Sequence, residues 1–408
     1  MLTKELNDRL CMTGPGTPGG EFLRRYWQPV GLSQDVKAGG KPFQIRIMSE
    51  DLVLFRDDLA RAGLVGLHCS HRLTSLAYGR VEDGGIRCPF HGWLYDVEGR
   101  CLEQPAEPES STFKERVRHT AYPCQELGGI IFAYMGPAER IPLLPRYEVL
   151  VSENGTRQAT SYTINCNYMQ NIEGTDATHF LYLHTEPWSL LKPKLFSMQR
   201  TQIAFEEADY GLFETVWQPH IERGGGSTHH AHFVLPAGFL RMDHRASRVL
   251  RYQSWYVPMD DMHTYRVQVG FAPLGPDGAP YMWRAEEDYT QPGPENDYFR
   301  DYEHVDTISG IPGHSGPGTA TKGFLCQDNM ANETEGPIMD RSREHLGSSD
   351  RLIAAIRKQM LMGIAAVERG GDPKNIFRDT AQNVLIRLPT GDEEPLSVAG
   401  GAQAGDRR

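Results

Sequence analysis

The chain has 408 residues, more than one ordinary hydrophobic core accommodates, so its length favours two domains, with one large α+β domain as the alternative. Its formal net charge of -11 excludes nucleic acid and anionic membranes as partners, because both normally require a basic face. The longest apolar run, residues 129–135, is far too short to cross a bilayer, and residues 1–9 lack a signal-peptide core, so we expect a soluble, cytoplasmic protein.

The first part of the chain has the pattern of short antiparallel strands. Apolar residues alternate over residues 43–47, another apolar run covers residues 52–55, and a turn signal follows at residues 83–85. We therefore expect an N-terminal segment at residues 1–20 and a small antiparallel β domain at residues 20–145.

The remainder of the chain predicts a larger domain of strands and helices. A helix-compatible stretch covers residues 160–185, and longer strands are expected within residues 200–285. A Gly- and Pro-rich loop at residues 308–323 leads toward a final helix. We place this domain at residues 146–390 and expect a disordered tail at residues 391–408.

The final helix has the clearest periodicity of the chain. Ser349 is expected to cap its start, and Gly370 and Gly371 to end it. Its apolar positions are Ile353, Ile356, Met360, Ile364 and Val367.

The seven cysteines form an odd set spread over a long chain, which argues against a disulfide framework and for a reducing compartment. Two of them lie close to histidines, in the patterns Cys69-x-His71 and Cys88-x-x-His91. We expect the other five to be buried thiols, namely Cys11, Cys101, Cys124, Cys166 and Cys326.

The two Cys/His patterns predict a metal centre at the tips of two hairpins. Two cysteines and two histidines fit a structural zinc as well as an iron–sulfur cluster. Common zinc fingers take both cysteines from one loop and both histidines from a helix, whereas each loop here supplies one cysteine and then one histidine. This order favours the cluster and keeps zinc as the alternative.

The segments "HCSHR" and "CPFHGWLYDVEGRC" together resemble the Rieske iron–sulfur proteins. The resemblance implies a [2Fe-2S] cluster in which Cys69 and Cys88 hold one iron and His71 and His91 the other. Neutral imidazoles leave less negative charge on such a cluster, so its potential rises and it serves as an electron relay. Relatives usually carry Pro and Gly where this chain has Ser70 and Leu73.

A second group of metal-ligating residues lies in "NCNYMQNIEGTDATHFLYLH", residues 165–184. It contains Asp176, His179 and His184. Residues i and i+5 of an ideal helix lie about 140° apart, so both histidines face one metal only if the helix is distorted or ends between them. Taken alone, the pair is also compatible with two unrelated histidines.

Beside the Rieske patterns, this segment resembles the mononuclear-iron motif of the Rieske non-haem iron oxygenases, in the alpha (large) subunit of the aromatic-ring-hydroxylating enzymes. The resemblance implies a facial triad of two histidines and a later carboxylate. The segment "FLCQDNMANETEGPIMDRSREHLGSSD" supplies Asp328 as the third ligand of His179 and His184, with Glu333 as the runner-up. A surface acid is the alternative for Asp328.

Asp176 is the expected catalytic link between the two centres. The family implies a ring of three subunits, as a homotrimer or a dimer of trimers, in which the cluster of one subunit serves the iron of its neighbour. Asp176 would join His179 to His91 of the partner subunit, or in the alternative only orient His179. Relatives usually carry one more residue between Glu173 and this Asp.

The segments "MTGPGTPGGEFLRRYWQPVGL" and "EGPIMDRSREHLGSSD" resemble the branch with phthalate and phenoxybenzoate dioxygenases. The resemblance implies a Rieske domain followed by a helix-grip catalytic domain with an antiparallel sheet. Electrons from NAD(P)H would come through a separate flavin and iron–sulfur reductase, with or without a ferredoxin, since no Gly-x-Gly-x-x-Gly loop follows a strand here.

The branch implies a small aromatic substrate, an aromatic carboxylate, that is hydroxylated or dihydroxylated with O2. Arg241 and Arg251 are candidate partners for that carboxylate. Three alternatives stay open: a Rieske monooxygenase that removes an O-methyl group or adds one hydroxyl, a Rieske electron carrier, and a zinc-stabilised binding protein.

Overall fold

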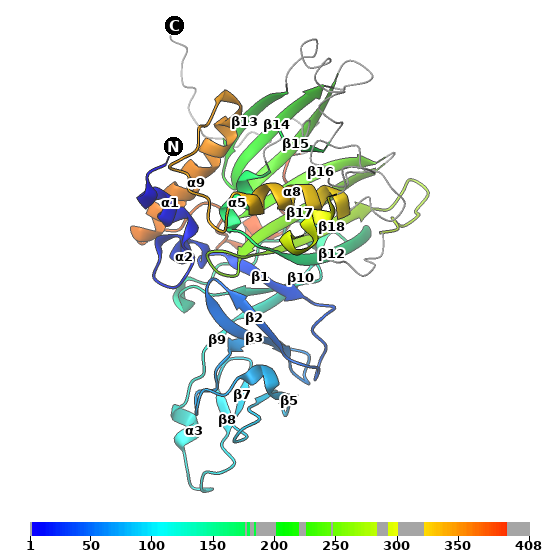
Figure 1. Ribbon diagram of the computed structural model, residues 1–408. Coiled ribbons are helices and arrows are strands. Elements are labelled where there is room, and N and C mark those ends of the chain that lie inside the picture. The colour runs from blue at the N-terminus through cyan, green and yellow to red at the C-terminus, as the bar shows by residue number, and fades with distance from the viewer. Residues whose placement is uncertain are drawn as a thin grey trace.

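The computed structural model describes residues 2–175, 178–179, 183–184, 201–219, 226–245, 248–283, 293–300 and 322–389. Helices and antiparallel sheets are mixed in these residues, which confirms the α+β class (Figure 1). The α-helices are α1 (Lys4–Cys11), α2 (Pro18–Leu23), α3 (Phe113–Arg116), α4 (Glu148–Val151), α5 (Tyr168–Glu173), α8 (Lys322–Thr334) and α9 (Arg351–Glu368). None of the described helices is long and apolar enough to cross a membrane. The tail at residues 391–408 and most of the loop at residues 308–323 lie outside the described residues.

Three small antiparallel sheets form the N-terminal part, in the orders β1-β11-β10, β2-β3-β4-β9 and β5-β6-β7-β8. Their strands are β1 (Trp27–Leu32), β2 (Phe43–Ile47), β3 (Glu50–Arg56), β4 (Ala62–Gly66), β5 (Arg80–Glu82), β6 (Gly85–Arg87), β7 (Leu94–Asp96), β8 (Cys101–Glu103), β9 (Ala121–Tyr122), β10 (Cys124–Leu127) and β11 (Ile130–Tyr134). The strands expected at residues 43–47 and 52–55 are confirmed as β2 and β3. Figure 1 shows β5, β7 and β8 at one end of the molecule, which we call the tip.

A seven-stranded antiparallel sheet, in the order β12-β18-β17-β16-β15-β14-β13, forms most of the second part. Its strands are β12 (Gly155–Ile164), β13 (Gln202–Ala208), β14 (Gly211–Pro219), β15 (Gly226–Val234), β16 (Gly238–Arg245), β17 (Arg248–Pro258) and β18 (Thr264–Pro273). Tyr162 of β12 and Tyr256 of β17 both pair with Arg266 of β18. Directly paired residues point to the same face of a sheet, so these three side chains lie together.

The helix-compatible stretch expected at residues 160–185 begins as a strand. β12 continues to Ile164 and pairs with β18 along its whole length. α5 starts only at Tyr168, with Asn167 as its N-cap, whose side chain accepts a hydrogen bond from the Met169 amide. The prediction was wrong for residues 160–164 because the partner strand lies far along the chain and leaves no local signal.

α9 is the expected final helix, and Gly370 follows its end with φ of +78°. The expected cap by Ser349 was wrong, because a short 3₁₀ turn at Ser348–Asp350 makes Asp350 the N-cap. Gly363 lets α9 approach α2 closely, since a Cβ at this position would lie 2.4 Å from the Phe22 ring. The buried apolar side chains of α9 are Leu352, Ile356, Met360, Ile364 and Val367.

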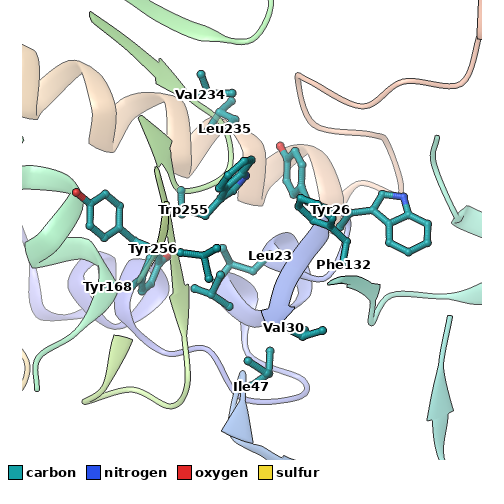
Figure 2. Packing of buried hydrophobic residues seen from close by; sticks show 14 of the residues in the cluster. Leu23, Tyr26, Val30, Ile47, Phe132, Tyr168, Val234, Leu235, Trp255 and Tyr256 are labelled. Carbon is teal, nitrogen blue, oxygen red and sulfur yellow. The ribbon is translucent and has the colours of Figure 1, made fainter. Parts of the chain in front are cut away.

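One hydrophobic core joins the N-terminal part to the large sheet. Figure 2 shows side chains from both parts in contact, such as Phe132 of β11 and Trp255 of β17, whose ring centroids lie 5.8 Å apart. A second, separate core lies between the tip and the strands β3 and β4, and it includes Phe55, Trp93 and Tyr95. The tip is therefore stabilised largely by this second core.

All seven cysteines lie in the described part of the chain, and none forms a disulfide there. Cys124 is half-buried and the other six are buried. Burial raises the pKa of the Cys11 and Cys101 thiols to about 11 and that of Cys124 and Cys166 to about 12, so these four stay protonated at neutral pH.

Candidate metal centres and active site

Two loops at the tip, residues 69–74 and 88–93, carry the Cys/His patterns and share one backbone geometry. We call them the knuckle loops. The Cys69 amide donates to the Thr74 carbonyl at 2.9 Å, and the Cys88 amide donates to the Trp93 carbonyl at 2.8 Å. The carbonyl of each cysteine accepts from the amide four residues later, at 2.9 Å in the first loop and 3.1 Å in the second. The two loops therefore present their ligand residues in the same way despite the different Cys-to-His spacing.

The knuckle loops bring the four expected cluster ligands together, with the cysteines inside and the histidines outside. Cys69 and Cys88 are 1% and 3% exposed, whereas His71 is exposed and His91 half-buried. The two imidazole rings lie 4.6 Å apart, and Trp93 stacks on His71 at 4.5 Å with an interplanar angle of 6°. The histidine side of this group consequently faces the protein surface.

Tyr95 and His119 support the first knuckle loop, and sequence reasoning missed both. The Tyr95 hydroxyl lies 3.2 Å from Cys69 Sγ, and burial raises the pKa of Tyr95 well above its ordinary value, so the hydroxyl keeps its proton. His119 packs on the Tyr95 ring at 4.6 Å and its Nδ1 lies 2.8 Å from Ser70 Oγ. Ser70, the departure from the usual Pro, thus ties the loop to His119. Tyr95 lies in the motif "CPFHGWLYDVEGRC", whereas no sequence pattern indicates a role for His119.

His179, His184 and Asp328 meet beside the large sheet, and their ligand atoms all lie within 4.8 Å of one another. Asp328 Oδ1 is 3.5 Å from His179 Nε2 and 3.0 Å from His184 Nε2. The Leu183 amide donates to the His179 carbonyl at 2.7 Å, and His184 directly follows Leu183. The ring centroids of His179 and His184 lie 5.0 Å apart.

Gln327 fixes the orientation of His184, and sequence reasoning missed it. Its side chain is fully buried, and its Oε1 lies 2.7 Å from His184 Nδ1. An amide oxygen only accepts hydrogen bonds, so Nδ1 carries the proton and the lone pair of Nε2 points toward Asp328. Two neutral imidazoles and one carboxylate, with their donor atoms this close, fit the ligand set of a mononuclear ferrous site.

Glu333, the runner-up to Asp328, has a different position on α8. Its Oε1 accepts from the Asn165 amide at 2.8 Å, and its Oε2 accepts from the Tyr298 hydroxyl at 2.8 Å. Both oxygens are therefore used in contacts away from the histidines, and burial raises the pKa of this carboxyl. Asp176 lies outside the described residues.

Glu173 anchors the end of α5, just before the histidine segment. It forms buried ion pairs with Arg341 at 2.8 Å and with Arg357 at 2.7 Å. Burial opposes its charge, but the two guanidinium groups outweigh that effect and lower the pKa of Glu173 below its ordinary value. Arg357 also pairs with Glu344, so this network ties α5 to α9 and to the segment before it.

The contacts of the two arginines considered for a substrate carboxylate do not favour that role. Arg251 Nε lies 3.0 Å from Glu148 Oε2, which already neutralises it. Arg241 is exposed, with its guanidinium 5.9 Å from the centroid of the Tyr252 ring.

Comparisons with known proteins show which families and relatives the chain resembles. A family model described as "Rieske [2Fe-2S] domain" matches residues 26–118, and one described as "LigXa C-terminal domain like" matches residues 293–382. The chain is 35% identical to the 5,5'-dehydrodivanillate O-demethylase oxygenase subunit of Sphingobium sp. (strain NBRC 103272 / SYK-6), over 96% of this chain and 87% of the relative.

Two further similarities extend over most of the chain. The phenoxybenzoate dioxygenase subunit alpha of Ectopseudomonas oleovorans is 34% identical, over 94% of this chain and 90% of the relative. The solved structure of NdmA from Pseudomonas putida CBB5 with caffeine superposes with a TM-score of 0.64 at 18% identity, over 86% of this chain and 93% of that one. The structural likeness supports the fold.

Proposed function

The chain belongs to the Rieske non-haem iron oxygenases, as an oxygenase subunit, and on this basis we propose that it oxidises an aromatic carboxylate with O2. Relatives named for phenoxybenzoate, phthalate and dehydrodivanillate support this substrate class. Electrons from NAD(P)H arrive through a separate reductase, with or without a ferredoxin, because the relatives are oxygenase subunits of multicomponent systems.

Cys69, Cys88, His71 and His91 are the proposed ligands of the [2Fe-2S] cluster. The common hydrogen-bond pattern of the knuckle loops and the pairing of the two histidines at 4.6 Å support this assignment. With Cys69 as a thiolate ligand, the Tyr95 hydroxyl 3.2 Å away would donate to Cys69 Sγ, draw negative charge from the sulfur and favour the reduced form of the cluster. The exposed histidine side would be the face through which electrons leave.

His179, His184 and Asp328 are the proposed ligands of the mononuclear iron. The observation that carries the proposal is the convergence of their three ligand atoms within 4.8 Å. These three residues would hold a ferrous ion, which would supply dioxygen activation there. Gln327 keeps the proton on His184 Nδ1 so that Nε2 remains a ligand, and Asp328 contributes the one negative charge.

Asp176 and the subunit assembly complete the proposal. We infer a homotrimer or a dimer of trimers, because a head-to-tail contact must close into a ring. Asp176 would link His179 to His91 of the partner subunit by hydrogen bonds and so provide the path for the electron between the two centres. The Asp176→Asn variant should keep both metals and the assembly, yet reoxidise its reduced cluster at least about 100-fold more slowly. A wild-type rate in single-turnover stopped flow would contradict this role.

Metal analysis combined with turnover tests the function. The holoenzyme should contain about three irons and two sulfides per chain, with a red-brown spectrum, and should consume O2 and NADH with a reductase and an aromatic carboxylate. About two irons with sulfide would indicate an electron carrier, and zinc without sulfide a binding protein.

O-demethylation is the second candidate reaction, because the dehydrodivanillate O-demethylase subunit is similar over nearly the whole chain. Product analysis separates the two reactions. A dihydroxylated ring retains the substrate's carbon atoms, whereas demethylation releases formaldehyde and a phenol.

A further inference from the structure

Arg266 stands apart from the other buried arginines in the described part of the chain. Four arginine side chains are buried there, and three of them pair with a glutamate: Arg24 with Glu50, Arg341 with Glu173, and Arg357 with Glu173 and Glu344. Arg266 is 8% exposed and forms no ion pair with a described residue. A buried guanidinium normally has a carboxylate partner, and none of the described carboxylates lies within ion-pair distance of Arg266.

The contacts of Arg266 are aromatic and neutral. It donates to the hydroxyl of Tyr162, and its Nη2 donates to Ser254 Oγ at 3.3 Å. The guanidinium lies 5.3 Å from the ring centroid of Tyr162 and 5.7 Å from that of Tyr256. Its buried Nε–H has no acceptor among the described residues. The Nε–H of the guanidinium therefore stays available for an acceptor outside the described residues.

Arg266 and Thr264 lie two residues apart in β18, so their side chains point to the same face of the large sheet. Thr264 Oγ1 donates to the Cys166 carbonyl at 2.8 Å, and the neighbouring Asn165 amide donates to Glu333 of α8 at 2.8 Å. α8, which carries Asp328, crosses in front of β17 and β18 in Figure 1. Burial opposes the charge of Arg266, but Tyr162, Tyr256 and Asp328 outweigh it and raise its pKa above the ordinary value. The carboxylate of Asp328 likewise contributes to the raised pKa of Tyr162. The arginine is therefore charged and within electrostatic reach of the metal ligand.

The charge balance of this region favours an anionic ligand. Once Asp328 binds a divalent metal, its single negative charge is committed to that metal, and Arg266 keeps no described counterion. A cation flanked by two aromatic rings offers one charged contact and two flat apolar surfaces. This combination suits a planar aromatic ring that carries a carboxylate.

We propose that Arg266 binds the carboxylate of the aromatic substrate and so sets the preference of this enzyme for acids over their neutral analogues. The inference rests on the proposed function for the presence of an aromatic substrate. Arg266 is then a specificity-determining residue, and Tyr162 and Tyr256 hold its guanidinium in place.

Equilibrium binding to the oxidised holoenzyme, measured by calorimetry, tests the proposal. The probes are benzoate, phthalate, phenoxybenzoate and dehydrodivanillate, each with its uncharged amide. Arg266→Met should weaken binding of the preferred acid at least about 30-fold and leave its amide nearly unaffected, because a buried charge pair is lost. Arg266→Lys keeps the charge and should retain a preference for the acid, which covers the case in which the Met variant folds poorly. NADH-dependent O2 uptake should follow the same order.

Arg157 of β12 provides the matched control. Its guanidinium donates to the carbonyls of Val149 and Ser152, both at 2.7 Å, so Arg157→Met should leave the preference for the acid intact. Equal affinity of wild type and Arg266→Met for the acid would overturn the inference. It would also be overturned if Arg266→Met lost affinity for the acid and the amide equally and lost its iron as well. A wild type with three irons that oxidises only the amides, or binds none of the acids, would overturn it and leave the oxygenase in place. Absence of the irons would instead overturn the proposed function.

Discussion

Leu73 and Gly92 hold the same place in the two knuckle loops. The amide of each donates to the carbonyl of the cysteine four residues earlier, and their φ angles are +61° and +74°. This left-handed region suits glycine and costs other residues about 1–2 kcal/mol. The first loop therefore contains a strain that the second loop avoids.

Leu73→Gly should stabilise the tip by about 0.5–1 kcal/mol, because relief of the strained φ exceeds the entropy that glycine adds to the unfolded chain. Leu73 is 70% exposed, so little buried apolar surface is lost. The measurement is the temperature at which the visible chromophore is lost. Gly92→Ala is the opposite change, and should lower that temperature, since its Cβ would also lie 3.0 Å from Pro105 Cγ. An unchanged or lower midpoint for Leu73→Gly would contradict the argument.

His184→Ala should abolish substrate oxidation and leave the fold and the chromophore in place, because the mononuclear iron loses one of three protein ligands. Cys88→Ser is the complementary change, and should bleach the chromophore while His179 and His184 still bind ferrous iron. The measurements are visible spectra, iron content and O2 uptake. Turnover by His184→Ala would remove the proposed mononuclear site.

Gln327→Leu should weaken iron binding about 10- to 100-fold without changing the cluster spectrum. The Leu side chain has no acceptor for His184 Nδ1–H, so the imidazole loses the contact that fixes its tautomer. Titration of the apoprotein with ferrous iron gives the affinity. Gln327→Glu restores an acceptor and should recover most of it. Equal affinities for the Leu and Glu variants would exclude this role for the hydrogen bond.

The stability of the protein should fall as the pH drops from about 6.5 to 4, in part because of His232. Burial lowers the pKa of this histidine from 6.5 to about 4, and the neighbouring His230 adds to the effect. The hydrogen bond between His232 Nε2 and the Pro389 carbonyl, at 2.9 Å, opposes this shift but does not outweigh it. Between these pH values the unfolded state binds a proton that the folded state does not, and this favours unfolding.

The contribution of His232 at pH 4 is about 3 kcal/mol relative to neutral pH, from its pKa difference between the two states. His232→Gln removes the titrating group, so urea unfolding of this variant should depend less on pH over that range by about this amount. The same pH dependence in both proteins would show that His232 does not titrate as expected.

The local features of the sequence predicted the short strands, the final helix and the knuckle residues, since each depends on neighbours within a few positions. Periodicity could not predict the first residues of the stretch at 160–185, because β12 is specified by pairing with β18. Asp328 also lies far along the chain from His184, so it was predicted only from the family resemblance. The short distance between the two residues becomes visible only in the fold.

The supporting residues were missed for a physical reason. Gln327 and His119 form hydrogen bonds to groups far away in the chain, and no sequence spacing predicts such contacts. Arg266 lies in an ordinary strand pattern, and only the fold shows that no described carboxylate pairs with it.

The two separate cores have a practical consequence for anyone who purifies this protein. Because the tip has a core of its own, heat or oxidation can bleach the colour of a preparation while the larger part stays folded and keeps its iron. Such bleached molecules would still pass a gel filtration column with the intact ones. The ratio of visible to ultraviolet absorbance then reports the fraction of enzyme that retains its cluster and can transfer electrons. A specific activity calculated per milligram of protein understates the turnover of each coloured molecule.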